Sequence, residues 1–142
     1  MAKTTSFASS ILDLIFNATA IANIADNSAT SPLTNLYVSL HTADPGTAGD
    51  QTTNETSYTG YARVAVARTS GGWTVTDNVV TPAAAITFGE LTAGPATITH
   101  MGIGTAASGA GVLLYSGALS SSVVAGIGDA PVIKTTSTVT ET

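Results

Sequence analysis

The segment LYVSLHTADPGTAGDQTTNETSYTGYARVAVAR, residues 36–68, decides the fold class of this chain. At its start, Leu36, Val38 and Leu40 alternate with polar or aromatic residues. Successive side chains of a strand point to opposite faces, so this alternation predicts a half-buried strand. It places Ser39 and His41 on the other face, where we expect them to meet solvent or a neighbouring protein.

A turn and a second strand complete this segment. Asp44-Pro45-Gly46 predicts a type II turn, because proline presets the φ of the first central position and glycine accepts a positive φ at the second. A long polar loop follows. Alternation resumes from Tyr61 to Arg68, with Ala62, Val64 and Val66 expected to face inward.

The chain after Arg68 consists of short β candidates separated by glycine and proline. Asp77-Asn78 predicts a tight hairpin into Val79 and Val80, and the glycines from 102 to 111 predict a second hairpin. Many short strands with such breaks indicate an antiparallel sandwich or barrel. We therefore expect a mainly β fold, an antiparallel jelly-roll-like β-sandwich with a short N-terminal α-helix. Further strand candidates are 86–88, 96–103, 112–115 with Leu119, 122–124, 132–134 and 138–140.

The N-terminal segment FASSILDLIFN predicts the helix, with Thr5 or Ser6 as its cap. One face carries Phe7, Ile11, Leu14 and Ile15 at three- and four-residue spacing. The flank carries Leu12 and Phe16, so two surfaces are expected to cover the helix. One reading assigns one of these surfaces to a neighbouring subunit, and the other reading buries the helix in its own core. The partner-interface candidates are Phe7, Ile11, Leu12, Ile15 and Phe16. Residues 1–35 then form the helix and a connecting arm, and residues 36–142 the β-sandwich of a single domain.

Composition indicates a protein that lives in contact with neighbours. The chain has 142 residues, a net charge of -5 and only 9% charged residues, against roughly a quarter in ordinary soluble domains. Alanine, threonine, serine and glycine take their place. A surface of small and hydroxyl-bearing side chains loses little side-chain entropy when it is covered, which suits permanent contacts.

The same composition argues against several classes of partner. The basic residues are Lys3, Arg63, Arg68 and Lys134, which make no patch for a phosphate backbone, so nucleic acid is not an expected partner. No apolar run approaches the length needed to cross a bilayer and the start does not resemble a secretion signal, so no membrane partner is expected. The chain has no cysteine, which excludes disulfides and thiolate metal sites.

No residue pattern predicts catalysis, a cofactor or a metal, so we do not expect an enzyme. Ser39, His41 and Asp44 lie close in sequence, but their strand lacks the elbow and oxyanion turn of a nucleophile site. The loop acids do not have the spacing of a calcium loop. One pairing stands out: Arg63 or Arg68 with a loop carboxylate such as Glu55, since a guanidinium holds a carboxylate through two bonds and pins a long loop.

Several stretches together resemble a known family. LYVSLHTADPG, YTGYARVAV, ITF, THMGIGTAASG and LLYSGAL, in this order, are similar to small tailed-bacteriophage virion proteins. Members are labelled tail fibre proteins, and some similar small proteins are capsid decoration or cement subunits. The resemblance covers most of the chain, including the N-terminal helix.

Resemblance and composition together predict a structural protein of the virion, made in the cytoplasm of the bacterial host. We expect a capsid decoration subunit on the capsid surface, which binds the major capsid protein and copies of itself in a homo-oligomer. The alternative is a tail fibre or baseplate-associated component that binds tail proteins, with the loop 47–59 as its exposed tip. A third class, a binding sandwich unconnected to virions, stays open.

Overall fold

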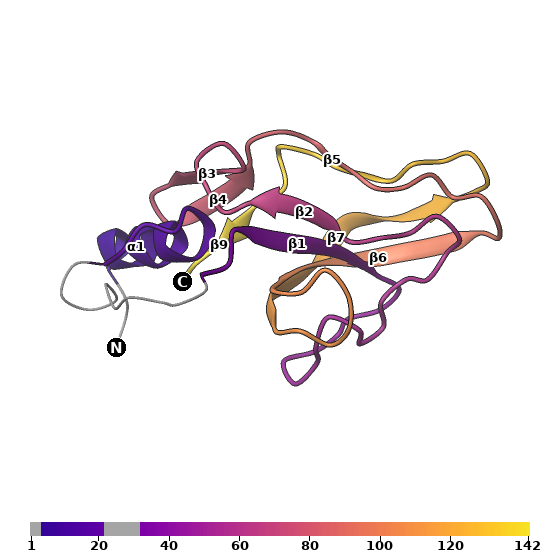
Figure 1. The fold of residues 1–142 in the computed structure, drawn as a ribbon, viewed down its shortest axis with the longest axis horizontal. Coiled ribbons are helices and arrows are strands. Elements are labelled where there is room, and N and C mark those ends of the chain that lie inside the picture. Colours follow the sequence, from indigo (N-terminus) through magenta and orange to yellow (C-terminus); the bar gives the residue numbers. More distant parts are fainter. Residues whose placement is uncertain (1–3, 22–31) are drawn as a thin grey trace. The chain divides into compact units, whose positions relative to one another are not determined.

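The computed structural model describes residues 4–21 and 32–142 of the chain. These parts are mainly β, with one short helix near the N-terminus (Figure 1). The strand pairs β1–β6, β6–β7, β3–β4 and β4–β9 are all antiparallel, which confirms the predicted fold class; the jelly-roll arrangement stays a prediction. The elements are α1 (Thr5–Phe16), β1 (Asn35–His41), β2 (Val64–Ala67), β3 (Trp73–Thr76), β4 (Val79–Pro82), β5 (Ile86–Thr87), β6 (Ala96–Gly104), β7 (Leu113–Ala125), β8 (Val132–Ile133) and β9 (Val139–Thr140).

The chain forms two compact units. The helix unit comprises Met1–Asn35, Val66–Ile86 and Lys134–Thr142, and the sheet unit comprises Leu36–Ala65 and Thr87–Ile133. The chain first passes from the helix unit into the sheet unit after Asn35, which is also where the predicted N-terminal arm ends. Most of that connecting arm lies outside the described residues. Within the described part of the chain, the helix falls short of the length and apolarity that crossing a membrane requires.

In the helix unit, α1 buries a different side from the predicted one. Its cap is Thr4, whose hydroxyl accepts a hydrogen bond from the Phe7 amide at 3.3 Å. The predicted caps Thr5 and Ser6 are instead the first two residues of the helix. Residues spaced four apart lie on one stripe of a helix, and the stripe of Ala8, Leu12 and Phe16 is buried. Phe7, expected on the main apolar face, is 42% exposed. The expected flank is therefore the core side of α1.

A three-stranded sheet in the same unit supplies the surface on which α1 packs. The rings of Phe16 and Trp73 meet edge to face with centroids 4.8 Å apart. Trp73 begins β3, which turns through Asp77-Asn78 into β4, and Asp77 has a φ of 53°. This confirms the predicted hairpin, which needs a residue that tolerates positive φ. The order of strands is β3-β4-β9.

The sheet unit is built on β1, β6 and β7, which lie side by side in a sheet of order β2-β1-β6-β7 (Figure 1). β1 pairs with β6 from Tyr37 opposite Gly104 to His41 opposite His100. β7 is one strand of 13 residues, whereas sequence predicted separate pieces. Its register with β6 shifts between Ile98 and His100, and this bulge lets the strand continue through its serine run. β5 and β8 pair in a small separate sheet.

The polar face of β1 does not meet solvent as predicted. Ser39 and His41 are both fully buried. The loop after β1 folds back onto the strand, where the Thr56 amide donates to the Leu40 carbonyl at 2.9 Å and the Thr42 amide donates to the Asn54 carbonyl at 2.8 Å. Alternation in the sequence identified the strand, but a loop from the same chain covers its second face.

Replacing Leu12 tests which side of α1 faces the core. Leu12→Ala removes a fully buried side chain and is expected to lower the free energy of unfolding by about 2–5 kcal/mol. Phe7→Ala, on the exposed side, is the matched control and is expected to cost less than about 1 kcal/mol. Urea denaturation of both variants measures the difference. Equal losses would contradict the assigned core side.

Candidate functional site

The densest group of polar side chains in the sheet unit surrounds Arg63, the residue before β2. The Arg63 side chain is 3% exposed and that of Glu55 is 15% exposed. Arg63 Nε donates to Glu55 Oε1 at 2.7 Å and one terminal nitrogen donates to Oε2 at 2.7 Å. Two parallel bonds between a planar guanidinium and a carboxylate fix both position and orientation. The Glu55 carboxylate also raises the pKa of Arg63.

The remaining donors of Arg63 reach a second loop. Loop A denotes residues 42–63, between β1 and β2, and loop B denotes residues 105–112, between β6 and β7. Arg63 donates to the Ala106 carbonyl at 2.9 Å and to the Gly109 carbonyl at 2.8 Å. One side chain therefore holds Glu55 of loop A and two backbone carbonyls of loop B at the same time.

Tyr61 ties this cluster to β1. Its hydroxyl donates to Glu55 Oε1 at 2.7 Å and accepts from the Leu40 amide at 3.1 Å. Its ring stacks on Phe88 and meets Tyr58 edge to face. Burial raises the pKa of Tyr61, so the phenol stays protonated and able to donate.

Gln51 joins the two loops at a second point. Its side chain is fully buried, and its Oε1 accepts from the Ala106 amide at 2.9 Å. The Gln51 backbone amide donates to the Ala110 carbonyl at 2.9 Å. Gly104 leaves the room for this side chain, because a Cβ there would lie 2.2 Å from the Gln51 amide carbon. Glycine at this position is therefore needed for the contact between the loops.

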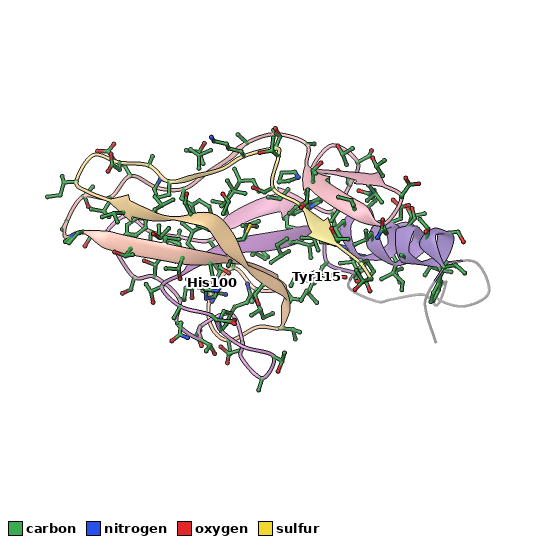
Figure 2. The ribbon with its side chains drawn as sticks, turned by 180° about the vertical axis from the view of Figure 1, so that it is seen from behind. His100 and Tyr115 are labelled. Carbon is green, nitrogen blue, oxygen red and sulfur yellow. The ribbon has the colours of Figure 1, made fainter. Side chains whose placement is uncertain are left out.

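His41, the last residue of β1, holds loop A through its ring. A carbonyl only accepts, so Nδ1 donates to the Thr53 carbonyl at 2.9 Å, and the neutral Nε2 accepts from Ser39 Oγ at 2.8 Å. Burial lowers the pKa of His41. Gly102 makes space for the pair, since a Cβ there would lie 2.8 Å from both His41 Nε2 and Ser39 Oγ. His100, opposite His41 on β6, bonds Thr99 at 2.8 Å (Figure 2).

The polar side chains of loop A and β1 bond mainly to one another and to backbone groups. Ser39 and His41 form a hydrogen bond at 2.8 Å, and both residues are fully buried. Asp44 and Asp50, the other loop acids, accept bonds from the amides of Gly46 and Thr52 at 2.8 Å each and shape turns. Across residues 4–21 and 32–142, no group of three or more His, Cys, Asp or Glu side chains is arranged to hold a metal ion.

Arg68, the other arginine predicted to pin the loop, lies elsewhere. It belongs to the helix unit and donates to the carbonyls of Leu14, Ile15 and Leu33 at 2.6, 2.5 and 2.9 Å. The first two are carbonyls at the end of α1, which have no partner within the helix. Sequence gave no signal for this contact, because the arginine follows the helix by more than fifty residues.

The five interface candidates on α1 do not share one face. Leu12 and Phe16 are fully buried, Ile11 and Ile15 are half-buried, and Phe7 is exposed. The tail alternative expected residues 47–59 of loop A as an exposed tip, yet Gln51, Thr56 and Tyr58 within this range are buried. What the structure adds beyond the prediction is the second anchor, loop B.

Fold and cluster together define a β-rich scaffold whose loops are held by internal bonds. Over residues 2–141 the chain matches the family described as Podophage GP4 fiber I protein gp80, and it belongs to that family. No curated protein matches the chain. The family makes this a structural protein of the phage virion, which confirms the resemblance at that level.

Removing the Arg63 guanidinium is expected to free both loops. Arg63→Met leaves the Glu55 carboxylate partly buried without its charged partner and removes the bonds to the Ala106 and Gly109 carbonyls, so we expect the free energy of unfolding to fall by roughly 3 kcal/mol. Lys134→Met, which removes an exposed cation, is the control and is expected to stay within about 0.5 kcal/mol of the parent. Urea denaturation measures both. A loss as small as that of the control would show that the pair does not hold the loops.

His41 predicts a pH dependence of stability. The pKa of His41 is lowered in the folded state from its ordinary value of 6.5, so below that value the unfolded chain binds more protons. Stability therefore falls as pH drops from about 6.5 through the folded pKa, at up to about 1.4 kcal/mol per pH unit. The hydrogen bond to the Thr53 carbonyl and the charge of Glu55 raise the pKa of His41, but burial outweighs both. Denaturation from pH 7.5 to 5 is expected to show a smaller slope in His41→Gln; an unchanged slope would contradict the assignment.

Proposed function

We propose that this protein is a subunit of the phage fibre that acts by assembly and catalyses no reaction. The family match over residues 2–141 carries the fibre assignment. The cluster around Arg63 supports a scaffold, because its ionised and nucleophilic side chains bond to each other or to backbone. Ordering loops A and B in the free protein lowers the entropy lost when a neighbour binds them.

The proposed contacts use surface that the fold leaves uncharged. On α1, Phe7 is exposed and Ile11 and Ile15 are half-buried, and we assign them to a neighbouring subunit. Copies of this chain and an adjoining tail protein are the proposed partners. Each contact is weak, but contacts repeated around a symmetric assembly act together.

Capsid decoration is a second candidate, with the major capsid protein as partner. The low share of charged residues, 9%, favours it as much as it favours a fibre. In this role the protein would bind across joints of the shell and stabilise the assembled state by mass action. The two roles differ in where the protein lies on the virion and in how many copies it holds.

Copy number and position separate these roles. In purified particles, quantitative mass spectrometry is expected to find far fewer copies of a fibre subunit than of the major shell protein. In electron micrographs, gold-labelled antibody against the protein is expected at the tail. A copy number near that of the shell protein, with label over the whole head, would support decoration and contradict the fibre proposal. Absence of the protein from infectious particles would contradict both.

A further inference from the structure

Residues 53–56 of loop A lie on the end of β1 and bond to its backbone. The Thr42 amide donates to the Asn54 carbonyl at 2.8 Å, and the Thr56 amide donates to the Leu40 carbonyl at 2.9 Å. Both bonds break if this segment lifts from the strand. The exchange of these two amides therefore reports whether the segment is bound or released.

Two side-chain contacts hold this segment, and they respond differently to protons. Glu55 binds Arg63 through two bonds of 2.7 Å, and a guanidinium keeps its charge at every pH that a protein meets. His41 Nδ1 donates to the Thr53 carbonyl at 2.9 Å, and imidazole is the side chain whose charge changes near neutral pH. The second contact is therefore the one that a modest change of pH can alter.

The closed loop suits only the neutral ring of His41. Its Nε2 accepts from Ser39 Oγ at 2.8 Å, and both residues are fully buried. A proton on Nε2 makes this nitrogen a donor, so the Ser39 hydroxyl proton loses the acceptor that it has now. Gly102, opposite Ser39 on β6, brings no side chain that could accept it instead.

The charged groups near His41 come from loop A and from β6. Burial lowers the pKa of His41 most strongly. The bond to the Thr53 carbonyl and the charge of Glu55 raise this pKa, and the charges of Arg63 and His100 lower it. His100 stands opposite His41 in the pairing of β1 with β6. The net effect is that the closed loop disfavours a charged imidazole.

We propose that His41 is a proton-dependent switch for loop A: when Nε2 takes up a proton from water, residues 53–56 lift from β1 and the charged ring becomes solvated. A solvated imidazole titrates near its ordinary value of 6.5, so the released state binds more protons than the closed state below that pH. Acid therefore favours release. The pair of Arg63 and Glu55 opposes it, which keeps the released state a minor one. The inference concerns the free chain and does not rest on the proposed function.

Hydrogen exchange of single amides, followed by NMR on the full chain from pH 7.5 to 5, tests this switch. After correction for the intrinsic rate, the protection of the Thr42 and Thr56 amides is expected to fall below pH 6.5. The fall is up to about tenfold per pH unit until the folded pKa of His41 is reached. Asp50 does not interfere, because hydrogen bonds from Thr52 lower its pKa from 3.8, below the range tested.

Dilute urea distinguishes local release from unfolding of the whole unit. Lifting a short segment exposes little surface, so the protection of Thr42 and Thr56 at pH 5.5 is expected to stay constant as urea is added. The Leu91 amide donates to the Asp129 carbonyl at 2.9 Å in the same unit and is expected to lose protection with urea. Equal urea dependence of all three amides would overturn the inference.

The two histidines of the chain provide matched variants. His41→Asn keeps an amide nitrogen near the position of Nδ1 but takes up no proton in this range, so the protection of the Thr42 and Thr56 amides is expected to be independent of pH. His100→Gln is expected to retain the pH dependence. Its loss in His100→Gln, its persistence in His41→Asn, or its absence from the parent would contradict the switch. If His41→Asn does not fold, the parent and His100→Gln still decide.

Discussion

The bidentate pair of Arg63 and Glu55 is the interaction on which the sheet unit depends. The Arg63 side chain is almost fully buried, and a buried guanidinium is tolerated only when its charge and its donors find partners. Glu55 supplies the charge, and the Ala106 and Gly109 carbonyls supply the remaining acceptors. Satisfying one cation thus requires loop A and loop B to lie together. Gln51, Tyr61 and His41 then fasten the same loop at further points.

Arg68 has the same role in the helix unit. Its side chain donates to the backbone carbonyls of Leu14, Ile15 and Leu33. The first two lie at the end of α1, where the helix dipole favours a positive charge. The chain has four lysines and arginines, and two of them organise backbone in this way. The surface left for partners is correspondingly poor in charge. The contacts with neighbours that we propose would therefore depend on shape and apolar burial more than on charge pairs.

The sequence predicted the strands and turns that depend on residues close to one another in the chain. Alternation identified β1, Asp77-Asn78 identified the β3–β4 hairpin, and Gly46 has the positive φ expected of the Pro45-Gly46 turn. Predictions that depended on distant contacts were less accurate. Ser39 and His41 are buried because loop A returns over them, and Arg68 binds a helix more than fifty residues earlier. Of the candidate site, the Arg63 and Glu55 positions were named, but loop B as the second anchor had no local signal.

Hydrogen exchange, read by mass spectrometry on the free chain and on the chain within particles, tests the central claim most directly. Loops ordered by Arg63 exchange slowly before any partner is present, whereas surfaces that serve assembly become protected only in the particle. The account predicts that residues 50–61 are protected in the free chain and that α1 gains protection in the particle. Fast exchange of residues 50–61 in the free chain, slowed only in the particle, would contradict it.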